Sequence, residues 1–538
     1  MNEQKAGKGA KRDRFAIGRC VRGLCRGAAA TAMVALLSAA CADAPASENT
    51  TWHASPIEET RPLFSQSIPP SEFAERLGRV YDAIGPNAVA VIQGAPSTMG
   101  SVTFRQSNEF YHLTGIASPH AYVILDGAQR EASLYLMPRD ERGEYSEGKV
   151  LSAEDADLIR ASSAIDHVHP LNDLVGHLQG WRGRAEQVYA PLAPPELRST
   201  TRGSATRTIQ NAAADPLDGR PARHERFLSE LARELGGVQI RDLNPILDEM
   251  RMIKSEREIQ LVRASSRLHG LAILEAMRAS ETGVSEADIE AVARFVFWRH
   301  GAMGSAYNAL SHIGANAYMN HYHAGVRVSL DGDMVLLDYG ADYEYYTSDM
   351  GRMWPVNGTF NDVQRELYGF YLGFYEAILN RIRPHVTAQQ VKLEALEEID
   401  RLLASWEFSR PTYEQAAHDF VEAYREGAQN PATRLGHSVG MAVHDPFPNS
   451  GELLPGMIFV IEPQFRVPDE KIYIRLEDTI LLTEDGVEII TDFVPRDIDS
   501  IERLVRQEGM LQHYRRLMSE DGEFLAEAER LIAAAGSR

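Results

Sequence analysis

The sequence predicts an α/β domain followed by an α+β domain, and three observations support this prediction. The chain has 538 residues, which is too many for one ordinary hydrophobic core. Between residues 70 and 245, short apolar runs such as AVAVIQG and AYVIL alternate with helix-like stretches such as ARHERFLSELAREL, a pattern typical of an α/β domain. Between residues 246 and 500, helical and strand-like segments are grouped in blocks, which indicates an α+β domain.

The first 41 residues have the pattern of an export signal. A basic stretch precedes an uncharged run of thirteen residues, Ala28 to Ala40, which fits a signal peptide and is too short for a membrane-spanning helix. The run ends at Ser38-Ala39-Ala40-Cys41, which resembles a bacterial lipobox, so we expect Cys41 to carry a lipid. Cleavage at the alanines without lipidation is the alternative. Residues 42–69 are rich in Pro, Ser, Ala and Thr and predict a flexible tether.

The net charge and the positions of the cysteines argue against a nucleic-acid-binding protein and against a disulfide-stabilised one. All three cysteines, Cys20, Cys25 and Cys41, lie in the leader region, so no disulfide is expected in the body of the chain. Residues 1–40 hold eight Lys or Arg and two Asp or Glu, so the net charge of −21 becomes −27 without them. Such an acidic body argues against a nucleic-acid partner. We therefore expect an exported, periplasmic protein that contacts a bacterial membrane only through its N-terminal lipid.

The second domain has recognisable element boundaries. Two amphipathic helices are expected at Ser255–Ser280 and Ser285–His300, the second opened by a cap formed by Ser285 and Asp288. A charged helical tail is expected over 501–538. The remaining expected segments are strands around 305–356, helices around 361–382, 387–405 and 412–426, and further strands around 436–493.

Two carboxylates flank the first strong turn of the second domain. Asp338 ends the apolar run MVLLD, and Asp349 lies in the strand-like run that follows the turn. If the hairpin is centred between Tyr343 and Glu344, the two aspartates face each other across the strand pair. Two like charges placed in this way destabilise a hairpin unless a counter-charge is present.

A second hairpin repeats the arrangement. Glu462 and Glu477 are opposite each other if the turn lies at Pro468–Lys471. Any one of these acids alone is typical of a strand end, and His437 alone is typical of a core histidine. Taken together, four acids flanked by apolar residues and one imidazole between the hairpins favour a pair of divalent metals, such as Mn²⁺, Co²⁺, Fe²⁺ or Zn²⁺.

The segment that carries His437 allows another interpretation. Gly436-His437-Ser438-Val439-Gly440 fits G-x-S-x-G, the nucleophile elbow of serine hydrolases, and the same residues can be a metal-site strand. An elbow requires a buried apolar strand before the serine, but REGAQNPATRLG is polar and contains a proline. It also requires an acid and then a histidine downstream, and only His444 and His513 follow. The metal-site interpretation is therefore favoured.

At this point the sequence resembles a known family. Asp338, Asp349, His437, Glu462 and Glu477, in LLDYGADYEYYTSDMGRMWPVNG, GHSVGMAVHDP, FVIEP and IRLEDTILLTEDG, resemble the aminopeptidase P and prolidase branch of the pita-bread metallopeptidases, family M24. The resemblance is strong over 246–500. FRQSNEFYHLTGIASPHAYVIL, at 104–125, resembles the creatinase-like N-terminal domain of aminopeptidase P. The resemblance therefore implies a creatinase-like α/β domain and an α+β pita-bread catalytic domain.

The family implies a role for each of the five residues. Asp349 and Glu477 would bridge two divalent ions, Asp338 would complete one ion, and His437 with Glu462 would complete the other. We expect Mn²⁺, with Co²⁺ or Zn²⁺ as alternatives. The pair would activate a water molecule, and Glu462 would carry its proton towards the leaving nitrogen.

Further residues would recognise the substrate. His321 and His444 match the outer histidines of the family, which would hold the substrate carbonyl oxygen; packing behind the ligands is the alternative. Arg475 would orient Glu477 or contact substrate, unless it is a solvated strand arginine. The walls of a proline pocket are expected from a further set of side chains, namely Tyr322, Val443, His444 and Phe465.

The expected activity is removal of one residue from peptides with proline at position two, by a protein that forms homo-oligomers. A prolidase restricted to dipeptides and a catalytically inactive binding module are the alternatives. The sequence departs from the family pattern at Thr433, where histidine or alanine is usual, and at IEPQFR after Glu462. Both departures lie near the expected proline pocket.

Overall fold

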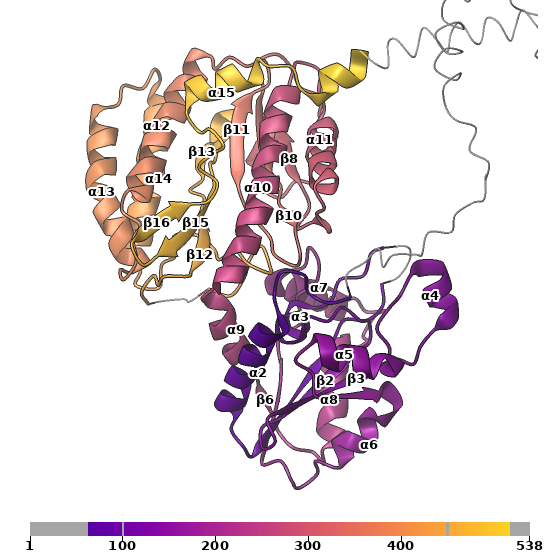
Figure 1. Cartoon of the computed structure of the whole chain (residues 1–538). Helices are drawn as coiled ribbons and strands as arrows, with labels where there is room; N and C mark the ends of the chain where they lie inside the picture. Colours follow the sequence, from indigo (N-terminus) through magenta and orange to yellow (C-terminus); the bar gives the residue numbers. More distant parts are fainter. Residues whose placement is uncertain (1–62, 99–101, 448–450, 517–538) are drawn as a thin grey trace, which may run out of the picture. The chain divides into compact units, whose positions relative to one another are not determined.

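A mixed six-stranded sheet organises the first part of the chain in the computed structural model, which describes residues 63–98, 102–447 and 451–516 (Figure 1). The strand order is β4-β3-β2-β1-β5-β6, with antiparallel pairing within β1, β2 and β3 and parallel pairing elsewhere. This sheet confirms the α/β prediction. Its strands are β1 (Ala88–Gln93), β2 (Tyr122–Asp126), β3 (Glu131–Leu136), β4 (His167–Pro170), β5 (Gln187–Ala190) and β6 (Ile240–Asp242).

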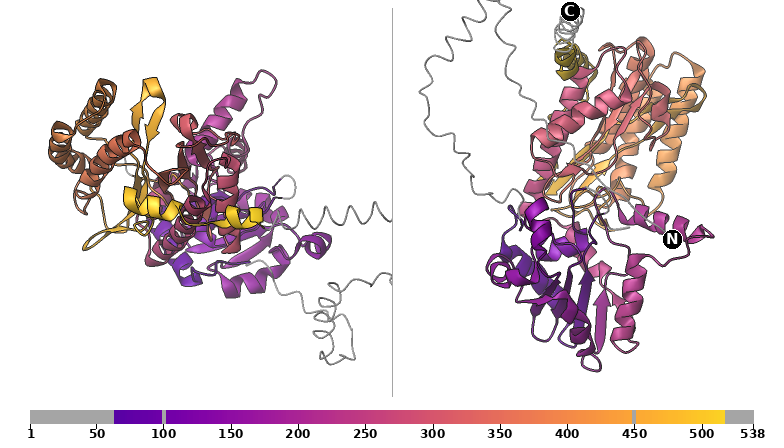
Figure 2. Two further views of the ribbon diagram at one scale, coloured as in Figure 1. Left: turned by 90° about the horizontal axis from the view of Figure 1, so that it is seen from above. Right: turned by 90° about the vertical axis from the view of Figure 1, so that its right-hand side faces the viewer.

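Helices cover both faces of this sheet, because the central strands carry apolar residues on both sides (Figure 2, right). In β1, Ala90 and Ile92 face one core, and Val89 and Val91 face the other. The helices are α2 (Pro70–Ile84), α3 (Asn108–Thr114), α4 (Glu141–Glu147), α5 (Ala156–Ser162), α6 (Leu174–Gln179), α7 (Arg202–Ala214), α8 (Arg223–Glu234) and α9 (Asn244–Met252), with short 3₁₀ turns η1 (Ala153–Asp155) and η2 (Leu171–Asp173).

The end of the predicted tether is packed on the protein. Phe64 pairs with Ile116 through an isolated bridge, and Ile68 is buried. Residues 42–62, the leader and Cys41 lie outside the described residues. Lipidation and export therefore stay predictions.

Two capped helices open the second part of the chain. α10 (Glu256–Ala279) begins after Ser255, and α11 (Glu286–Arg299) begins after Ser285, whose side chain and Asp288 form the expected capping box. Both helix predictions are confirmed. α11 packs on β8 of a sheet with the order β11-β9-β8. The elements here are β7 (Gly304–Ser305), β8 (Leu310–Ile313), η3 (Gly314–Tyr318), β9 (Met334–Asp338), β10 (Ala341–Asp342) and β11 (Gly351–Pro355).

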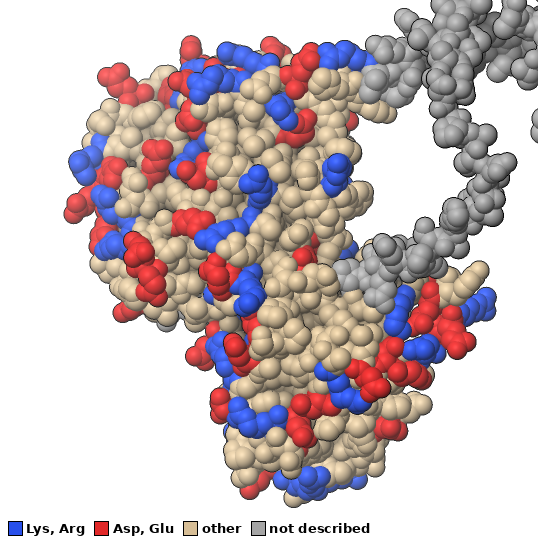
Figure 3. All heavy atoms as spheres, viewed as in Figure 1, with Lys and Arg blue, Asp and Glu red and all other residues tan. Residues whose placement is uncertain are grey.

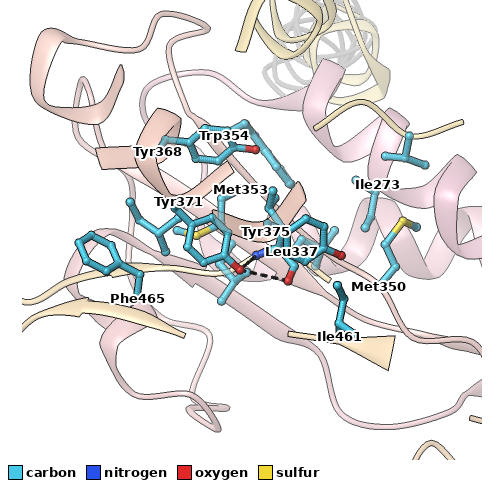
Figure 4. Close-up of a cluster of buried hydrophobic side chains, with 14 of the residues drawn as sticks. Ile273, Leu337, Met350, Met353, Trp354, Tyr368, Tyr371, Tyr375, Ile461 and Phe465 are labelled. Carbon is cyan, nitrogen blue, oxygen red and sulfur yellow. Dashed lines mark hydrogen bonds between the residues drawn. The ribbon is translucent and has the colours of Figure 1, made fainter. Parts of the chain in front are cut away.

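Three further helices pack beside a second sheet, β12-β15-β16, and the hairpin β13-β14 (Figure 1). Tyr368, Tyr371 and Tyr375 of α12 lie in one buried cluster with Leu337 and Trp354, as Figure 4 shows. The elements match the predicted ranges within a few residues: α12 (Asp362–Leu379), α13 (Ala388–Ser405), α14 (Pro411–Ala428), β12 (Ile458–Ile461), β13 (Phe465–Val467), η4 (Pro468–Glu470), β14 (Ile472–Ile474), β15 (Asp478–Thr483) and β16 (Gly486–Ile489).

The C-terminal segment differs from a single charged helix. α15 (Ile498–Val505) buries Ile501 and Val505 in the main core, and the helix stops before a second helical stretch that begins at residue 510. A side chain at Gly509 would lie 2.4 Å from the backbone nitrogen of Ala279, so the break lets the chain approach α10 closely. Residues 517–538 lie outside the described residues.

Acidic and basic side chains are interspersed on the face shown in Figure 3. Among the described residues, none of the helices is long and apolar enough to cross a membrane.

Candidate metal centre

The five predicted ligands lie where the two sheets of the second part meet. Gly351 at the start of β11 and Glu477 just before β15 form a backbone bridge, with N to O distances of 3.2 and 3.0 Å. Asp338 ends β9 and Asp349 precedes β11 by two residues, while Glu462 directly follows β12. Strand ends from two sheets therefore deliver the four acids to one place.

The register predicted for the first hairpin is wrong by two residues. Asp338 pairs with Gly351, not with Asp349. The turn is centred on Glu344 and Tyr345, which have φ angles of 46° and 73° and so form a tight turn that sequence patterns seldom assign to residues other than Gly, Asn or Asp. Asp349 consequently lies diagonal to Asp338 rather than directly opposite.

The register predicted for the second hairpin is confirmed. β12 pairs with β15 and β13 pairs with β14 in one continuous register, with Ile461 opposite Asp478 and Phe465 opposite Ile474. Glu462 and Glu477 are thus opposite each other, as expected. The turn closes at Lys471, which adopts the left-handed conformation. Tyr371 of α12 holds both strands of this hairpin. Its hydroxyl donates to the Pro463 carbonyl at 2.7 Å and accepts from the Leu476 amide at 2.9 Å.

His437 lies on an irregular segment rather than on the strand that the sequence suggested. Ser438 makes only isolated bridges, to Phe459 and Asp445. A side chain at Gly436 would lie 1.9 Å from the Val460 carbonyl oxygen, so this glycine lets the segment run against β12.

Ser438 cannot serve as an exposed nucleophile. Its side chain is 1% exposed. The hydroxyl donates to the Ile458 carbonyl at 3.0 Å and accepts from Lys254 Nζ at 3.1 Å. The serine-hydrolase alternative is therefore excluded by burial and bonding.

The ligand atoms of the five residues converge. His437 Nε2 lies 3.4 Å from Asp349 Oδ2, 3.6 Å from Glu462 Oε1 and 3.8 Å from Glu477 Oε1. Asp338 joins the group through shared partners, Tyr307 and Arg475. The structure therefore brings together all five residues that the sequence singled out.

Tyr307 is a site residue that sequence patterns did not reveal. Its hydroxyl lies 2.6 Å from Asp338 Oδ1 and 2.6 Å from Asp349 Oδ1. Burial, and then the charge of Asp338, raise the pKa of Tyr307 well above its ordinary value. A tyrosine before a short strand carries no spacing signal, so only the fold identifies it.

Arg475 is buried among the carboxylates and is not a solvated strand arginine. Its guanidinium contacts Asp338, lies 2.7 Å from Glu462 Oε2, and lies 3.7 Å from Glu477 Oε2. The prediction that Arg475 orients a carboxylate is consistent with these contacts. Its charge offsets only part of the negative charge of four acids.

The negative charge that Arg475 does not offset shifts the pKa values of the acids. Burial, followed by repulsion from Asp338, raises the pKa of Asp349 well above its usual range. Burial, followed by repulsion from Asp349, does the same for the pKa of Glu477. The pKa of Asp338 is lowered against the effect of its burial, because Arg475 and Tyr307 favour the carboxylate. Two of the acids therefore need a further cation to stay ionised.

The donor set fits divalent cations. Asp349, His437 and Glu477 each offer a ligand atom, and these atoms lie within 4.8 Å of one another in the described part of the chain. Glu477 Oε2 is buried and accepts no hydrogen bond from any described residue. Carboxylate oxygens with one imidazole nitrogen suit hard or borderline divalent metals. A metal at this point would satisfy the orphaned oxygen and lower the raised pKa values.

Of the two outer histidines, His444 lies beside the ligand His437, and His321 is close enough to His444 to affect its pKa. The ring of His444 is 3.9 Å from the ring of His437. Burial, then the positive charges of protonated His437 and His321, lower the pKa of His444 to about 3. His321 is exposed, and the loop that carries it is held by His312, whose Nε2 lies 2.8 Å from the Tyr322 carbonyl oxygen.

The prediction that Phe465 forms a wall of the proline pocket is wrong. Phe465 is fully buried in the hydrophobic core, in the cluster shown in Figure 4. Its ring lies against those of Phe370 and Phe420. It lies on β13, where strand alternation turns it inward. The Thr433 hydroxyl, at the position of the family departure, accepts a hydrogen bond from Lys392 at 2.7 Å.

A buried ionic cluster holds the histidine segment from behind. Asp445, next to His444, contacts Arg251 and lies 3.2 Å from Lys254 Nζ. Arg251 in turn pairs with Glu196 at 2.6 Å. This cluster joins the first part of the chain to the segment that carries His437.

Comparison with known proteins defines the class of protein. Residues 260–484 match the model of metallopeptidase family M24, and residues 73–189 match that of the aminopeptidase P N-terminal domain. The fold and the site are thus those of a two-domain metallopeptidase, with a creatinase-like domain before a pita-bread domain, and the chain is a hydrolase.

Individual relatives identify the branch. The Xaa-Pro aminopeptidase of Escherichia coli is 30% identical over 81% of this chain and 97% of its own length, and that of Haemophilus influenzae is 27% identical over 82% and 99%. The solved structure of E. coli aminopeptidase P with the inhibitor Pro-Leu superposes with a TM-score of 0.66 at 26% identity, covering 81% of this chain and 98% of that one. The chain belongs to the aminopeptidase P family, and it is a metallo-exopeptidase.

Proposed function

We propose that this protein hydrolyses the bond before a proline at position two of a peptide, using two divalent cations bound by Asp338, Asp349, His437, Glu462 and Glu477. The observation that carries the proposal is the convergence of these groups, with His437 Nε2 within 3.8 Å of oxygens from three different acids. Arg475 is the arginine that contacts three of these acids, and its single charge offsets only part of their negative charge.

The resemblance supports a division of roles among the ligands. Asp349 and Glu477 would bridge the two cations, Asp338 would complete one, and His437 with Glu462 would complete the other. When bound, the cations lower the pKa of a shared water molecule and polarise the scissile carbonyl group. The oxygen-rich set is the reason to propose Mn²⁺ first, with Co²⁺ and Zn²⁺ as alternatives.

Glu462 is the proposed proton carrier. Its side chain is 22% exposed, whereas that of Glu477 is 1% exposed, so Glu462 is the glutamate that can face both water and substrate. Arg475 Nη1 donates to Glu462 Oε2 at 2.7 Å. Glu462 Oε1 is therefore the oxygen that would accept the proton of the activated water. That proton then passes to the proline nitrogen as the peptide bond breaks.

His444 and His321 are proposed to orient the substrate carbonyl oxygen. The lowered pKa of His444 keeps its imidazole neutral at neutral pH, so it can donate one N–H without bringing a second positive charge beside the cations. A peptide bond before proline lacks an N–H, so recognition must rest on the ring and on the carbonyl oxygen. Tyr322 and Val443 remain the proposed apolar contacts for that ring.

Chelation followed by metal restoration tests this proposal. We expect a chelator to abolish hydrolysis of Arg-Pro-Pro, and Mn²⁺, Co²⁺ or Zn²⁺ to restore it. Pro-Leu, the inhibitor found with the E. coli relative, is a suitable competitor. A dipeptide such as Gly-Pro separates the prolidase alternative, because a prolidase would prefer it to the tripeptide. Absence of activity with every metal would support the binding-module alternative.

The location and assembly of the protein are separate proposals. The basic and apolar leader, followed by Cys41, supports export to the periplasm and anchoring to a bacterial membrane by a lipid. Mass spectrometry of the membrane fraction should show the lipid on wild-type protein and not on Cys41→Ser. We also propose a homo-oligomer, which sedimentation of the chain without residues 1–41 would test.

A further inference from the structure

Arg105 of the N-terminal part reaches two of the loops that carry proposed metal ligands. It lies just before α3 and is 6% exposed. Its Nε donates to Asp342 Oδ2 at 2.8 Å, and its Nη2 donates to the Tyr345 carbonyl at 3.1 Å and to the Met441 carbonyl at 3.2 Å. Its Nη1 donates to Asn108 Oδ1 at 2.6 Å, which fixes the guanidinium on its own domain.

The first of these loops contains the tight turn between Asp338 and Asp349. Glu344 and Tyr345 both have positive φ angles, a conformation that is unfavourable for residues with a side chain. Only the paired bonds between Tyr343 and Tyr346, both 2.9 Å, close the turn from within its own backbone. Contacts from outside must therefore help to hold this conformation.

The N-terminal part supplies those contacts. The Tyr345 ring stacks on the Tyr111 ring, with centroids 3.5 Å apart and an angle of 6° between the planes. The Tyr345 hydroxyl accepts from the Gln106 amide at 2.9 Å, and the Arg105 guanidinium lies 4.5 Å from the ring centroid. Ser67 donates to Glu344 at 3.0 Å.

The second loop is the histidine segment. Met441 lies between His437 and His444, so the bond from Arg105 to its carbonyl fixes the middle of that segment. The same guanidinium is bonded to the turn between Asp338 and Asp349. One buried side chain therefore bonds to two ligand-bearing loops that are about a hundred residues apart in sequence, and the Thr347 amide also donates directly across them to the Gly440 carbonyl at 2.8 Å.

We propose that Arg105 is a positioning residue for the metal centre: by bonding Asp342, Tyr345 and Met441, it sets the spacing between the aspartates and His437. The inference rests on the proposed metal-dependent function. It assigns the N-terminal domain a part in building the centre, in addition to any part in covering it. Arg105 acts through the two loops and does not touch the ligands themselves.

Co²⁺ binding to the full chain tests this role without relying on turnover. We expect Arg105→Gln to lower Co²⁺ affinity by about 10-fold in calorimetry and to change the visible absorption of the bound Co²⁺; this is the lower end of the range for groups bonded directly to metal ligands, because Arg105 acts one residue further from the ions. Hydrolysis of Arg-Pro-Pro should lose more in kcat than in KM. Arg105→Lys should recover part of the affinity, since an ammonium group can pair with Asp342 but cannot also reach both carbonyls.

Arg130→Gln is the matched control. Arg130 also belongs to the N-terminal part, also pairs with an aspartate, Asp82, at 2.6 Å, and also lies over a tyrosine ring, that of Tyr81, at 5.4 Å. It contacts neither ligand-bearing loop in the contacts of the described residues. The Co²⁺ affinity of the Arg130→Gln variant should stay within about twofold of wild type, and its Co²⁺ spectrum should be unchanged.

The outcomes separate the inference from the proposed function. If the wild-type protein binds no Co²⁺, the inference and the proposed function are both contradicted. If wild type binds Co²⁺ and a folded Arg105→Gln variant binds it with the same affinity and spectrum, the inference alone is overturned. Should Arg105→Gln fail to fold, Asp342→Asn decides, because it keeps the size of the side chain and removes the charge that accepts from Arg105 Nε. An altered Co²⁺ spectrum in that variant supports the inference, and an unchanged affinity and spectrum overturn it.

Discussion

The hairpin of β9 and β11 and the hairpin of β12 and β15 each supply two acids to one centre, yet they are held in different ways. The second keeps one register from Ile458 through the turn at η4 and back to Leu481. The first is interrupted, because β10 leaves it to pair with β7, and its turn at Glu344 and Tyr345 is bonded to the N-terminal part. Strand pairing that continues through the turn thus places Glu462 and Glu477, whereas the segment between Asp338 and Asp349 leaves the ladder and is held partly by contacts from the N-terminal part.

This difference gives the N-terminal part a direct structural connection to one of the two hairpins and, among the described residues, not to the turn of the other. A hairpin that is closed by its own backbone bonds can position side chains without help. A turn with two positive φ angles at residues other than glycine needs contacts from elsewhere, and those contacts can transmit changes. We therefore expect the two hairpins to respond differently to substitutions outside them.

Loss of one ligand from either hairpin should have the largest effect. We expect Asp349→Asn and Glu477→Gln each to reduce hydrolysis of Arg-Pro-Pro by more than about 100-fold, because loss of a ligand should exceed the 10- to 100-fold effect of its supporting partners. Metal content, measured by mass spectrometry, should fall in both. Asp485→Asn, in the exposed turn before β16, is the control. A variant that keeps both ions and full activity would remove its residue from the centre.

Substitution of the tyrosine beside the first hairpin should have the next largest effect. Tyr307→Phe removes the hydroxyl that contacts Asp338 and Asp349, so we expect a loss of about 10- to 100-fold in activity or Mn²⁺ affinity. Steady-state kinetics over a Mn²⁺ titration would measure it.

Tyr371→Phe is the matched comparison on the second hairpin, because its hydroxyl bonds only backbone groups of Pro463 and Leu476. We expect a loss of stability of about 1–3 kcal/mol and less than a tenfold loss of activity. Equal losses of metal affinity in the two variants would show that the hairpins do not differ as described.

A pH-dependent stability change should appear in the N-terminal part that holds the first hairpin. Burial, and then the charge of Glu196, raise the pKa of Glu109 from 4.5 to about 7. The folded chain therefore binds this proton more tightly than the unfolded chain. The stability that it contributes is fully present below about pH 4.5 and is lost as the pH rises through about 7.

Glu109→Gln removes this titration. Between pH 5 and pH 8, the unfolding free energy of wild type should fall by about 2–3 kcal/mol relative to the variant, as measured in urea. Glu75→Gln, on the exposed side of α2, serves as the control and should show no such difference. A constant difference between wild type and Glu109→Gln across this range would contradict the prediction.

The smallest effect on activity is expected at the serine of the histidine segment. Ser438→Ala removes a bond to Lys254 and a bond to Ile458, so the free energy of unfolding should fall by about 1–2 kcal/mol. Hydrolysis should stay within about twofold of wild type and should remain sensitive to chelators. Complete loss of activity in a folded, metal-loaded variant would revive the serine-hydrolase alternative.

Much of the fold could be predicted from the sequence because its signals are local. Ser285 with Asp288 marks the start of α11, and the turn at Pro468–Lys471 fixes the register of the second hairpin. The predicted register of the first hairpin was wrong by two residues, because its turn contains Glu344 and Tyr345, which are not typical turn residues. Phe465 was assigned to the substrate pocket because strand alternation alone does not say which face of β13 is buried.

The sequence by itself determined which side chains could form the centre, since four acids flanked by apolar residues, with a histidine between the two predicted hairpins, form a joint pattern along the chain. Only the tertiary structure decided how they are held. Tyr307, Arg105 and the cluster around Asp445 act across distances of 31 to 336 residues in sequence, and no local pattern encodes such contacts. The physical reason is that buried charges are stabilised by whichever partners the fold brings beside them, not by their neighbours in the chain.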